Sequence, residues 1–167
     1  MTNRERVVIC PGSYDPVTNG HMDIIGRTSN VFDRVVVGVV NQATRKQASM
    51  FTAEERQAFI QHAVAANGHD NVEVKIFSNL VVEFARENGA TAIVKGLRAI
   101  SDFEYEFEMN QLNRRLAPEI ESVFIIASAQ YSFLSSTGVK EMATFGGSVE
   151  ELVPDEVAEA LVQRAAR

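Results

Sequence analysis

The sequence predicts a doubly wound α/β fold, and two observations lead to this prediction. Five short runs rich in β-branched residues are apolar throughout instead of alternating with polar residues, which is typical of strands covered on both faces. Segments with helical periodicity lie between these runs, and this alternation produces a parallel sheet wrapped by helices. We therefore expect a single domain over residues 1–167, with a Rossmann-like, five-stranded parallel sheet and helices on both of its faces.

The elements follow in order along the chain. The strands are expected at residues 7–10, 35–40, 72–76, 91–94 and 123–126. The first helix is expected to carry Ile24, Ile25, Val31 and Phe32 on one face, and residues 80–87 form a short third helix.

Capping signals place the other helices. Thr52 with Glu55, and Ser101 with Glu104, have the spacing of a capping box, so one helix is expected to begin at each pair. The helix that begins near Ser101 is long and should end before Pro118, because proline cannot continue a helix. Two further helices are expected after Ser136 and from Pro154 onward.

The charge balance limits the possible partners. With 16 basic and 22 acidic residues the net charge is −6, whereas a protein that binds nucleic acid is usually basic. The longest aliphatic stretch, residues 35–40, is far too short for a membrane span, and residues 1–12 do not fit a signal peptide. Cys10 is the single cysteine, which excludes an intrachain disulfide and indicates a reducing compartment. We expect a cytoplasmic protein that binds neither nucleic acid nor membranes.

The distribution of cationic side chains predicts a small anionic ligand instead of nucleic acid. In doubly wound sheets, ligands bind at the carboxyl ends of the strands. The loops at this end hold five cationic or titratable side chains, in a chain that is acidic overall: His21, Arg45, Lys46, Lys95 and Arg98. Any one of them alone would usually be a solvated surface residue. Their coincidence at one edge favours a site for a polyanion.

Two of these loops lead into helices, whose N-terminal N–H groups attract anions. Residues 11–21 contain two Gly and two Pro and enter a helix near His21. Residues 131–137 contain three Ser and one Thr, of which Ser136 or Thr137 would cap the next helix while the others form a second phosphate cradle. The chain contains neither G-x-x-x-x-G-K-[ST] nor G-x-G-x-x-G, which argues against a P-loop NTPase or a Rossmann dehydrogenase.

The long helix carries two apolar stripes. One contains Phe103 and Phe107, and the other contains Tyr105, Met109, Leu112 and Leu116. Because a surface helix needs only one apolar face, this helix is expected either to be deeply buried or to lie at a subunit interface.

Several of these segments resemble a known superfamily. Asn19-Gly20-His21 resembles the [T/H]-x-G-H signature of nucleotidylyltransferases, and Ser135-Ser136-Thr137 with Lys140 resembles their I-S-S-T-x-[K/R] signature. Five blocks narrow the resemblance to bacterial phosphopantetheine adenylyltransferases, and they occur in order at residues 11–21, 50–56, 95–98, 102–106 and 131–141. The resemblance covers essentially the full chain.

The resemblance implies an activity and an assembly. The expected reaction moves AMP from ATP to 4′-phosphopantetheine by in-line attack, giving dephospho-CoA and pyrophosphate, with Mg²⁺ as the cofactor. A homohexamer is implied, together with binding of dephospho-CoA or CoA as product-like ligands. A sister enzyme with another phosphorylated acceptor, such as nicotinate mononucleotide, is the alternative. A nucleotide-binding regulatory module that has lost turnover is a second one.

The resemblance also assigns residues. His21 would stabilise the transition state at the α-phosphate. The ATP-binding residues would be Ser13, Tyr14, His21, Gly96, Leu97, Arg98, Glu106, Tyr131, Ser132, Phe133, Leu134, Ser135, Ser136 and Thr137. The acceptor would contact Ser13, Lys46, Val81 and Lys95, with Arg45 as an alternative to Lys46 because the loop between Asn41 and Met50 is longer than usual.

The expected chemistry needs no general base. A phosphate monoester has a second pKa of ~6, so it is mostly a dianion near pH 7 and already nucleophilic. The obstacle is the repulsion between this dianion and the triphosphate, so catalysis would consist of positioning and charge stabilisation. Mg²⁺ would bridge phosphate oxygens with few or no protein ligands.

Overall fold

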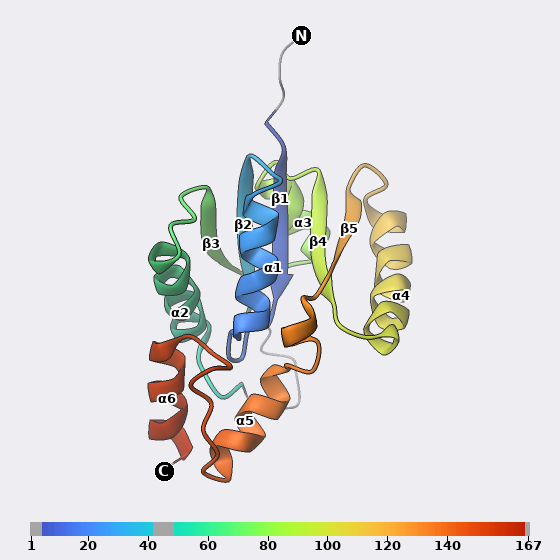
Figure 1. Cartoon of the computed structure of the whole chain (residues 1–167). Coiled ribbons are helices and arrows are strands. Elements are labelled where there is room, and N and C mark those ends of the chain that lie inside the picture. The colour runs from blue at the N-terminus through green and yellow to red at the C-terminus, as the bar shows by residue number, and fades with distance from the viewer. Residues whose placement is uncertain (1–4, 42–48, 166–167) are drawn as a thin grey trace.

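A computed structural model of the chain describes residues 5–41 and 49–165. Parallel strands form a five-stranded sheet in the order β3-β2-β1-β4-β5 (Figure 1). The strands are β1 (Val7–Gly12), β2 (Arg34–Val40), β3 (Val72–Phe77), β4 (Ala92–Leu97) and β5 (Glu121–Ile126). The first strand lies at the centre and the order reverses beside it, which confirms the predicted doubly wound fold.

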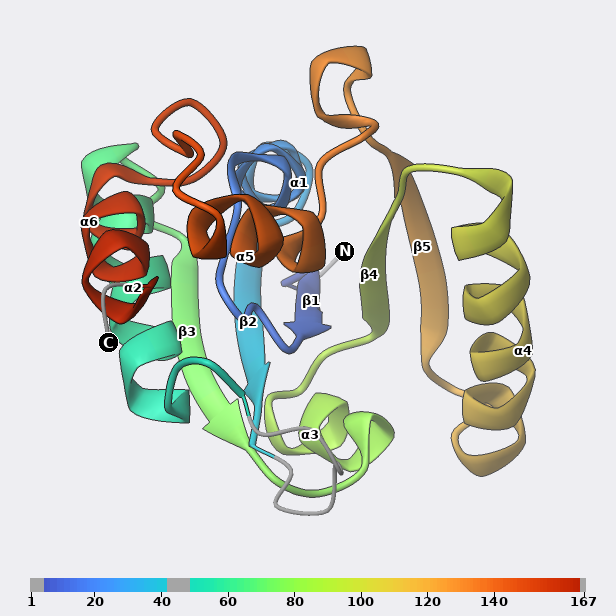
Figure 2. The same cartoon turned by 90° about the horizontal axis from the view of Figure 1, so that it is seen from below.

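Helices cover both faces of the sheet and the edge where its strands end. On one face lie α1 (Asn19–Ser29) and α2 (Ala53–Ala66), and on the other lie α3 (Val81–Glu87) and α4 (Ile100–Leu116). After β5 the chain forms a 3-10 turn (Ala129–Tyr131), then α5 (Ser136–Thr144) and α6 (Asp155–Ala165). Figure 2 looks at the edge where the strands end and shows α5 lying across the central strands. No helix in the described part of the chain is both long and apolar enough to cross a membrane.

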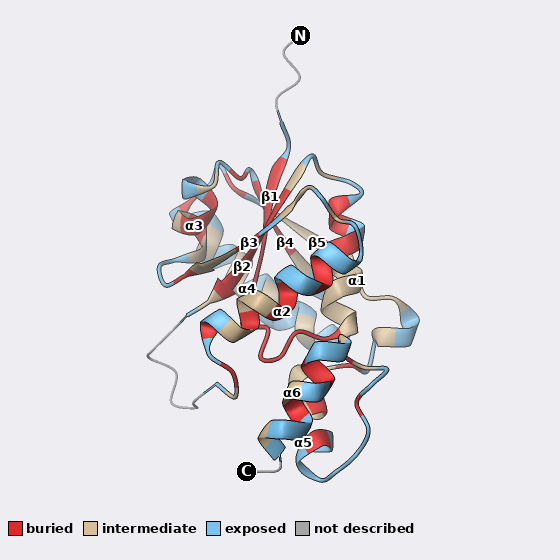
Figure 3. Cartoon of the chain, turned by 90° about the vertical axis from the view of Figure 1, so that its left-hand side faces the viewer, coloured by how far each residue is buried: buried red, intermediate tan, exposed pale blue. Residues whose placement is uncertain are grey.

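Alternate residues of the central strands face two separate apolar cores. Val8 and Cys10 of β1 pack into the core beneath α1, α2, α5 and α6, whereas Val7 and Ile9 pack into the core beneath α3. The central strands are therefore buried on both faces, as Figure 3 shows at the centre of the molecule. This double burial explains why the sequence shows no polar alternation in these runs.

The predicted boundaries are confirmed in some places and wrong in others. The Thr52–Glu55 capping box begins α2 as expected. The Ser101–Glu104 box is wrong, because α4 begins at Ile100 after Ala99 and has no side-chain cap. The expected face of the first helix is also wrong in part, since α1 ends at Ser29 and residues 31–32 lie beyond it.

The end of β4 differs from the prediction in a way that matters for the site. The strand extends three residues past Val94, because Lys95, Gly96 and Leu97 pair in register with β5 as far as Ile126. These residues therefore belong to a strand and not to the loop after it. Strand geometry fixes their backbone and leaves Arg98 as the first residue beyond the sheet.

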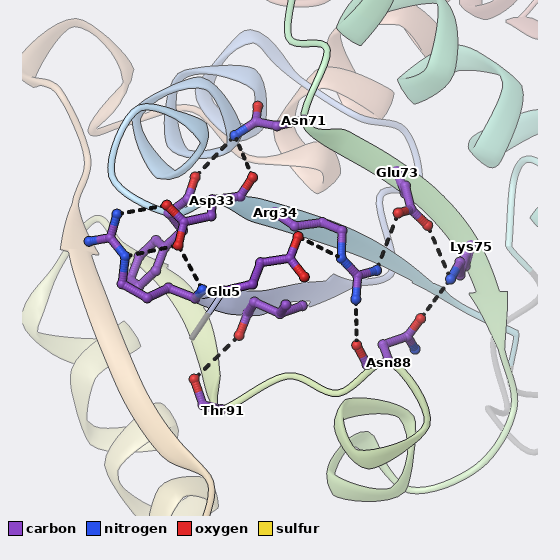
Figure 4. Close-up of polar contacts among 11 residues, drawn as sticks. Glu5, Asp33, Arg34, Asn71, Glu73, Lys75, Asn88 and Thr91 are labelled. Carbon is purple, nitrogen blue, oxygen red and sulfur yellow. Dashed lines mark hydrogen bonds and ion pairs between the residues drawn. The ribbon is translucent and has the colours of Figure 1, made fainter. Parts of the chain in front are cut away.

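A polar network closes the opposite edge, where the strands begin (Figure 4). The guanidinium of Arg6 donates to Asp33 at 2.9 Å, and that of Arg34 donates to Glu73 at 3.2 Å. The side-chain amide of Asn71 donates to the carbonyl oxygens of Ser29 and Phe32, at 2.9 and 3.0 Å, and so secures the turn after α1. The two edges thus differ, and the carboxyl edge opens into the cavity that holds most of the predicted site residues.

Candidate active site

A cavity of about 770 Å³ opens at the carboxyl edge of the sheet. Its walls come from the ends of β1 and β4, the start of α1, one side of α4 and the segment that enters α5. Thirteen of the predicted site residues line it: Ser13, Tyr14, His21, Val81, Lys95, Gly96, Arg98, Glu106, Tyr131, Leu134, Ser135, Ser136 and Thr137. Leu97, Ser132 and Phe133 do not line it, and Arg45 and Lys46 lie outside the described residues. Residues of both helix-entry loops therefore line one cavity, while their binding roles stay predictions.

The start of α1 holds His21 through a reciprocal pair of hydrogen bonds. Thr18 is the N-cap, and its Oγ1 accepts a bond from the His21 N–H at 3.3 Å. In return, Nδ1 of His21 accepts a bond from the Thr18 N–H at 3.0 Å. The histidine thus takes the place that Glu or Gln has in a usual capping box. Because Nδ1 is an acceptor, the proton of the neutral ring lies on Nε2, which leaves a hydrogen-bond donor on a side chain that lines the cavity.

The surroundings of His21 keep the ring neutral. Burial, together with the positive charge of Arg98, lowers the pKa of His21 to about 4. The ring of Tyr14 packs edge-on against the imidazole, with 5.1 Å between the ring centroids. Tyr14 has a backbone φ of 48°, a left-handed conformation that is uncommon for a large side chain, and its hydroxyl donates to the Cys10 carbonyl at 2.8 Å. His21 can therefore donate to an anion near pH 7 without carrying a charge.

Two cations from the end of β4 meet two acids of α4 in the cavity wall. Nζ of Lys95 lies 3.4 Å from Glu106, and Nε of Arg98 lies 2.9 Å from Asp102. The hydrogen bonds and charge of Arg98 hold the pKa of the Asp102 carboxyl below its ordinary value. Arg98 also donates to the carbonyl oxygen of Leu134 at 2.8 Å, so it ties β4 to the segment before α5. An anionic ligand at this wall would compete with the two carboxylates for the same cations.

The helix α4 is a wall of the cavity and not part of a core. None of its residues is buried, so the first of the two alternatives, a deeply buried helix, is wrong, and the subunit interface stays a prediction. Its inner side lines the cavity with Asp102, Tyr105, Glu106, Met109 and Asn113. Its outer side exposes Ile100, Phe103 and Phe107, and Leu112 and Leu116 of the other stripe are exposed as well. Of the two apolar stripes predicted from the sequence, the one with Tyr105 and Met109 therefore faces the cavity in part, and the one with Phe103 and Phe107 faces outward.

The hydroxyl groups before α5 are used differently from the prediction. The N-cap is Ser135, whose Oγ accepts from the Gly138 N–H at 3.1 Å, and neither Ser136 nor Thr137 has this role. The Ser136 hydroxyl donates to the Pro16 carbonyl at 2.7 Å, which joins this segment to the loop after β1. Ser135, Ser136 and Thr137 line the cavity, so the start of α5 lies where an anion could accept from a helix N-terminus.

Sequence reasoning missed several residues of this region. Asp15 and Arg56 are nearly fully buried and bond to backbone groups of several segments, whereas Met109 and Asn113 line the cavity. Arg56 donates to the carbonyl oxygens of Ser13 and Val40. The only signal in the sequence was that Asp15 and Arg56 lie in blocks of the resemblance, because burial of a charged group depends on partners distant in the chain.

Carboxylates and imidazoles do not gather as metal ligands in the parts of the chain that the structure describes. Across residues 5–41 and 49–165, no group of three or more His, Cys, Asp or Glu side chains has the geometry to hold a metal ion. The acids nearest the cavity, Asp102 and Glu106, are paired with Arg98 and Lys95.

Comparison with known proteins identifies the family of the chain. Residues 9–142 match the family model described as cytidylyltransferase-like. The chain is 49% identical over 160 residues to a phosphopantetheine adenylyltransferase of Alkaliphilus metalliredigens, covering 96% of this chain and 99% of that protein. It is 52% identical over 157 residues to one of Rubrobacter xylanophilus, covering 94% and 93%.

Solved structures share the fold at much lower identity. A putative nicotinate-nucleotide adenylyltransferase from Vibrio parahaemolyticus superimposes with a TM-score of 0.72 at 15% identity, covering 97% of this chain and 94% of that one. A bifunctional NMN adenylyltransferase/ADP ribose pyrophosphatase from Francisella tularensis gives a TM-score of 0.73 at 13% identity, covering 98% of this chain and 51% of that one. At such identity the likeness supports the fold alone.

The neutral state of His21 can be tested by titration. We expect ¹⁵N NMR to show a neutral ring with its proton on Nε2 down to about pH 5, and protonation only near the lowered pKa of about 4. In the unfolded chain in urea the same ring should titrate near 6.5. The unfolded state therefore binds the proton first, so stability should fall as the pH drops from 6.5 towards 4. A midpoint near 6.5 in the folded protein would contradict this assignment.

Proposed function

The chain belongs to the phosphopantetheine adenylyltransferase family, and we propose that it transfers AMP from ATP to 4′-phosphopantetheine. The products would be dephospho-CoA and pyrophosphate, as in coenzyme A synthesis. One observation carries the proposal: His21, Lys95 and the start of α5 line a single cavity. A neutral donor, a cation and a helix N-terminus are the groups that a phosphoryl-type transfer between two anions requires.

The proposed reaction is a single in-line displacement. A phosphate oxygen of the acceptor attacks the α-phosphorus of ATP, a new P–O–P bond forms, and the bond from the α-phosphorus to the β-phosphate oxygen breaks. Nε2–H of His21 would donate to an α-phosphate oxygen as charge builds there in the transition state. The first N–H groups of α5, with the hydroxyls of Ser135 and Thr137, would hold the departing pyrophosphate. The acceptor enters as a dianion, so no protein group has to remove a proton.

We propose that the acceptor phosphate replaces Glu106 as the partner of the Lys95 ammonium when the acceptor binds. The two side chains are 3.4 Å apart, a length that leaves the ammonium able to bond to another acceptor. Glu106 would then be available to the nucleotide, in agreement with the role that the resemblance assigns to it. Whether Lys46 or Arg45 adds a second cation to the acceptor phosphate is left open, because both lie outside the described residues.

We further propose that Mg²⁺ binds through the phosphate oxygens of ATP. The nearby acids, Asp102 and Glu106, are already engaged by Arg98 and Lys95, so the chain offers cations and N–H donors to the triphosphate instead of metal ligands. Mg²⁺ would supply charge neutralisation on the triphosphate. A cytoplasmic location is also proposed, because the lone cysteine fits a reducing compartment.

Release of pyrophosphate from ATP with a panel of acceptors tests the proposed function. We expect release with 4′-phosphopantetheine and little with nicotinate mononucleotide, and the new product should have the mass of dephospho-CoA. The same assay with CTP in place of ATP tests whether the enzyme selects the adenine base. Turnover with nicotinate mononucleotide alone would favour the alternative acceptor, and nucleotide binding with no turnover would favour a regulatory module.

Replacement of His21 by Ala tests its transition-state role. We expect kcat to fall by ~10²–10³, the scale for loss of one transition-state donor, while ATP still binds. His21→Gln, which keeps an N–H donor, should lose less. An unchanged kcat in His21→Ala would refute the role.

Replacement of Lys95 by Ala should weaken the binding of the acceptor more than the binding of ATP. We expect the acceptor Kd to rise by about 10- to 100-fold, because a charged hydrogen bond is lost and the carboxylate of Glu106 is left to repel the phosphate. Lys95→Arg, which keeps the charge, is the matched variant. Calorimetry that shows the larger loss for ATP would overturn the assignment.

We propose a homohexamer, and the outer side of α4 supports an interface. Phe103 and Phe107 are 46% and 51% exposed and stand in one apolar stripe with Ile100. Sedimentation velocity should give about six times the chain mass of 18.4 kDa. Changing Phe103 and Phe107 together to Glu should dissociate the assembly, whereas Phe145→Glu, at an exposed phenylalanine that ends α5, should not. A monomer in the unaltered protein would contradict the proposal.

A further inference from the structure

We infer that Asp15 and Lys140 act together as positioning residues that hold the two anion-binding segments of the site in register. The inference concerns how the site is built, and its importance for catalysis rests on the proposed function. It assigns to Lys140, the cation of the second signature segment, a role through Asp15 instead of a direct contact with the ligand.

The carboxylate of Asp15 joins three segments of the chain. Its side chain is only 10% exposed. Oδ2 accepts from the Met50 N–H at 2.9 Å, and Oδ1 accepts from the Phe51 N–H at 3.0 Å. Nζ of Lys140 donates to Oδ2 at 3.1 Å. The loop after β1, the segment that enters α2, and α5 therefore meet on one buried carboxylate.

Lys140 faces this carboxylate and not the cavity. It is absent from the cavity lining, although Ser135, Ser136 and Thr137 of the same segment belong to it. Its ammonium is engaged by Asp15, and its side chain is 29% exposed. A buried acid without its cation would carry a large desolvation cost, so each partner depends on the other.

The pair completes a set of bonds that orient the start of α5. The Ser136 hydroxyl bonds to the Pro16 carbonyl, and Arg98 bonds to the Leu134 carbonyl. With Lys140 on Asp15, the helix start is held on the same loop that leads to Thr18 and His21. A shift of this helix start would move the donors for the pyrophosphate relative to the donor for the α-phosphate, and such misplacement costs rate without removing any ligand contact.

A double-mutant cycle tests the inference with inorganic pyrophosphate and ATP as probes. We expect Asp15→Asn and Lys140→Met each to raise the Kd for pyrophosphate by about 10-fold, and the double variant to be no worse than either single one. Lys140→Arg should restore affinity to within about threefold, since it keeps a cation beside Asp15. A direct phosphate ligand would behave differently: Lys140→Met would lose affinity, Asp15→Asn would not, and the inference would be overturned.

Arg34 provides the matched control. Its side chain is also 29% exposed and is paired with an acid, Glu73, at the opposite edge of the sheet (Figure 4). Arg34→Met removes the same charge, and its pyrophosphate affinity should stay unchanged. Equal losses in Arg34→Met and Lys140→Met would mean that net charge alone is measured, and would also overturn the inference. Urea unfolding of each variant establishes that the folded fraction is the same in every titration.

The readouts separate this inference from the proposed function. The Kd for pyrophosphate is measured without any reaction. The double-mutant cycle therefore tests the inference even if the chain transfers no AMP. If the proposed transfer does occur, ATP KM and kcat should change together in both single variants, with no further change in the double variant. Additive losses in Kd across the cycle would refute the coupling whatever the acceptor proves to be.

Discussion

The site depends on holding two kinds of anion close together in a chain whose net charge is −6. Two phosphorylated ligands repel each other, and an acidic protein adds to that repulsion unless its cations are concentrated locally. The parallel sheet provides the concentration, because the carboxyl ends of its strands and the N-termini of the following helices share one edge. Without ligand, the cations of this edge are already paired: Lys95 with Glu106, Arg98 with Asp102 and Lys140 with Asp15. Pairing keeps all three in place, and an anion in the cavity would compete only for Lys95 and Arg98.

The neutral histidine follows from the same constraint. A protonated His21 beside Arg98 would be disfavoured both by burial and by like charge, and the capping bond from the Thr18 N–H fixes the tautomer. A neutral donor has a second advantage. A buried imidazolium would stabilise the triphosphate of the ground state as much as the transition state, and such uniform binding would not lower the barrier. A short-range donor aimed at one oxygen discriminates between the two better than an additional charge does.

Local patterns in the sequence predicted the architecture because the central strands are buried on both faces and the helices are periodic. They failed where distant partners decide the outcome. β4 continues to Leu97 because β5 pairs with it, and α4 begins at Ile100 after Ala99, which leaves Ser101 inside the first turn and not at the N-cap. The site loops could be predicted from their place at the carboxyl edge. The burial of Asp15 could not, because its partners lie 35 to 125 positions away along the chain.

The helix α4 would connect the cavity with the proposed assembly. A helix of a monomeric domain normally turns its apolar side inward, yet α4 turns Asp102, Glu106 and Asn113 toward the cavity and Phe103 and Phe107 outward. The inner side combines Tyr105 and Met109 with the acids that pair with Lys95 and Arg98. The apolar side then has no core of its own chain to join. A second copy that covers it would fix the position of the helix, and with it the carboxylates that compete with the ligand. In this arrangement, formation of the interface and the affinity of the site for anions depend on the same 17-residue helix.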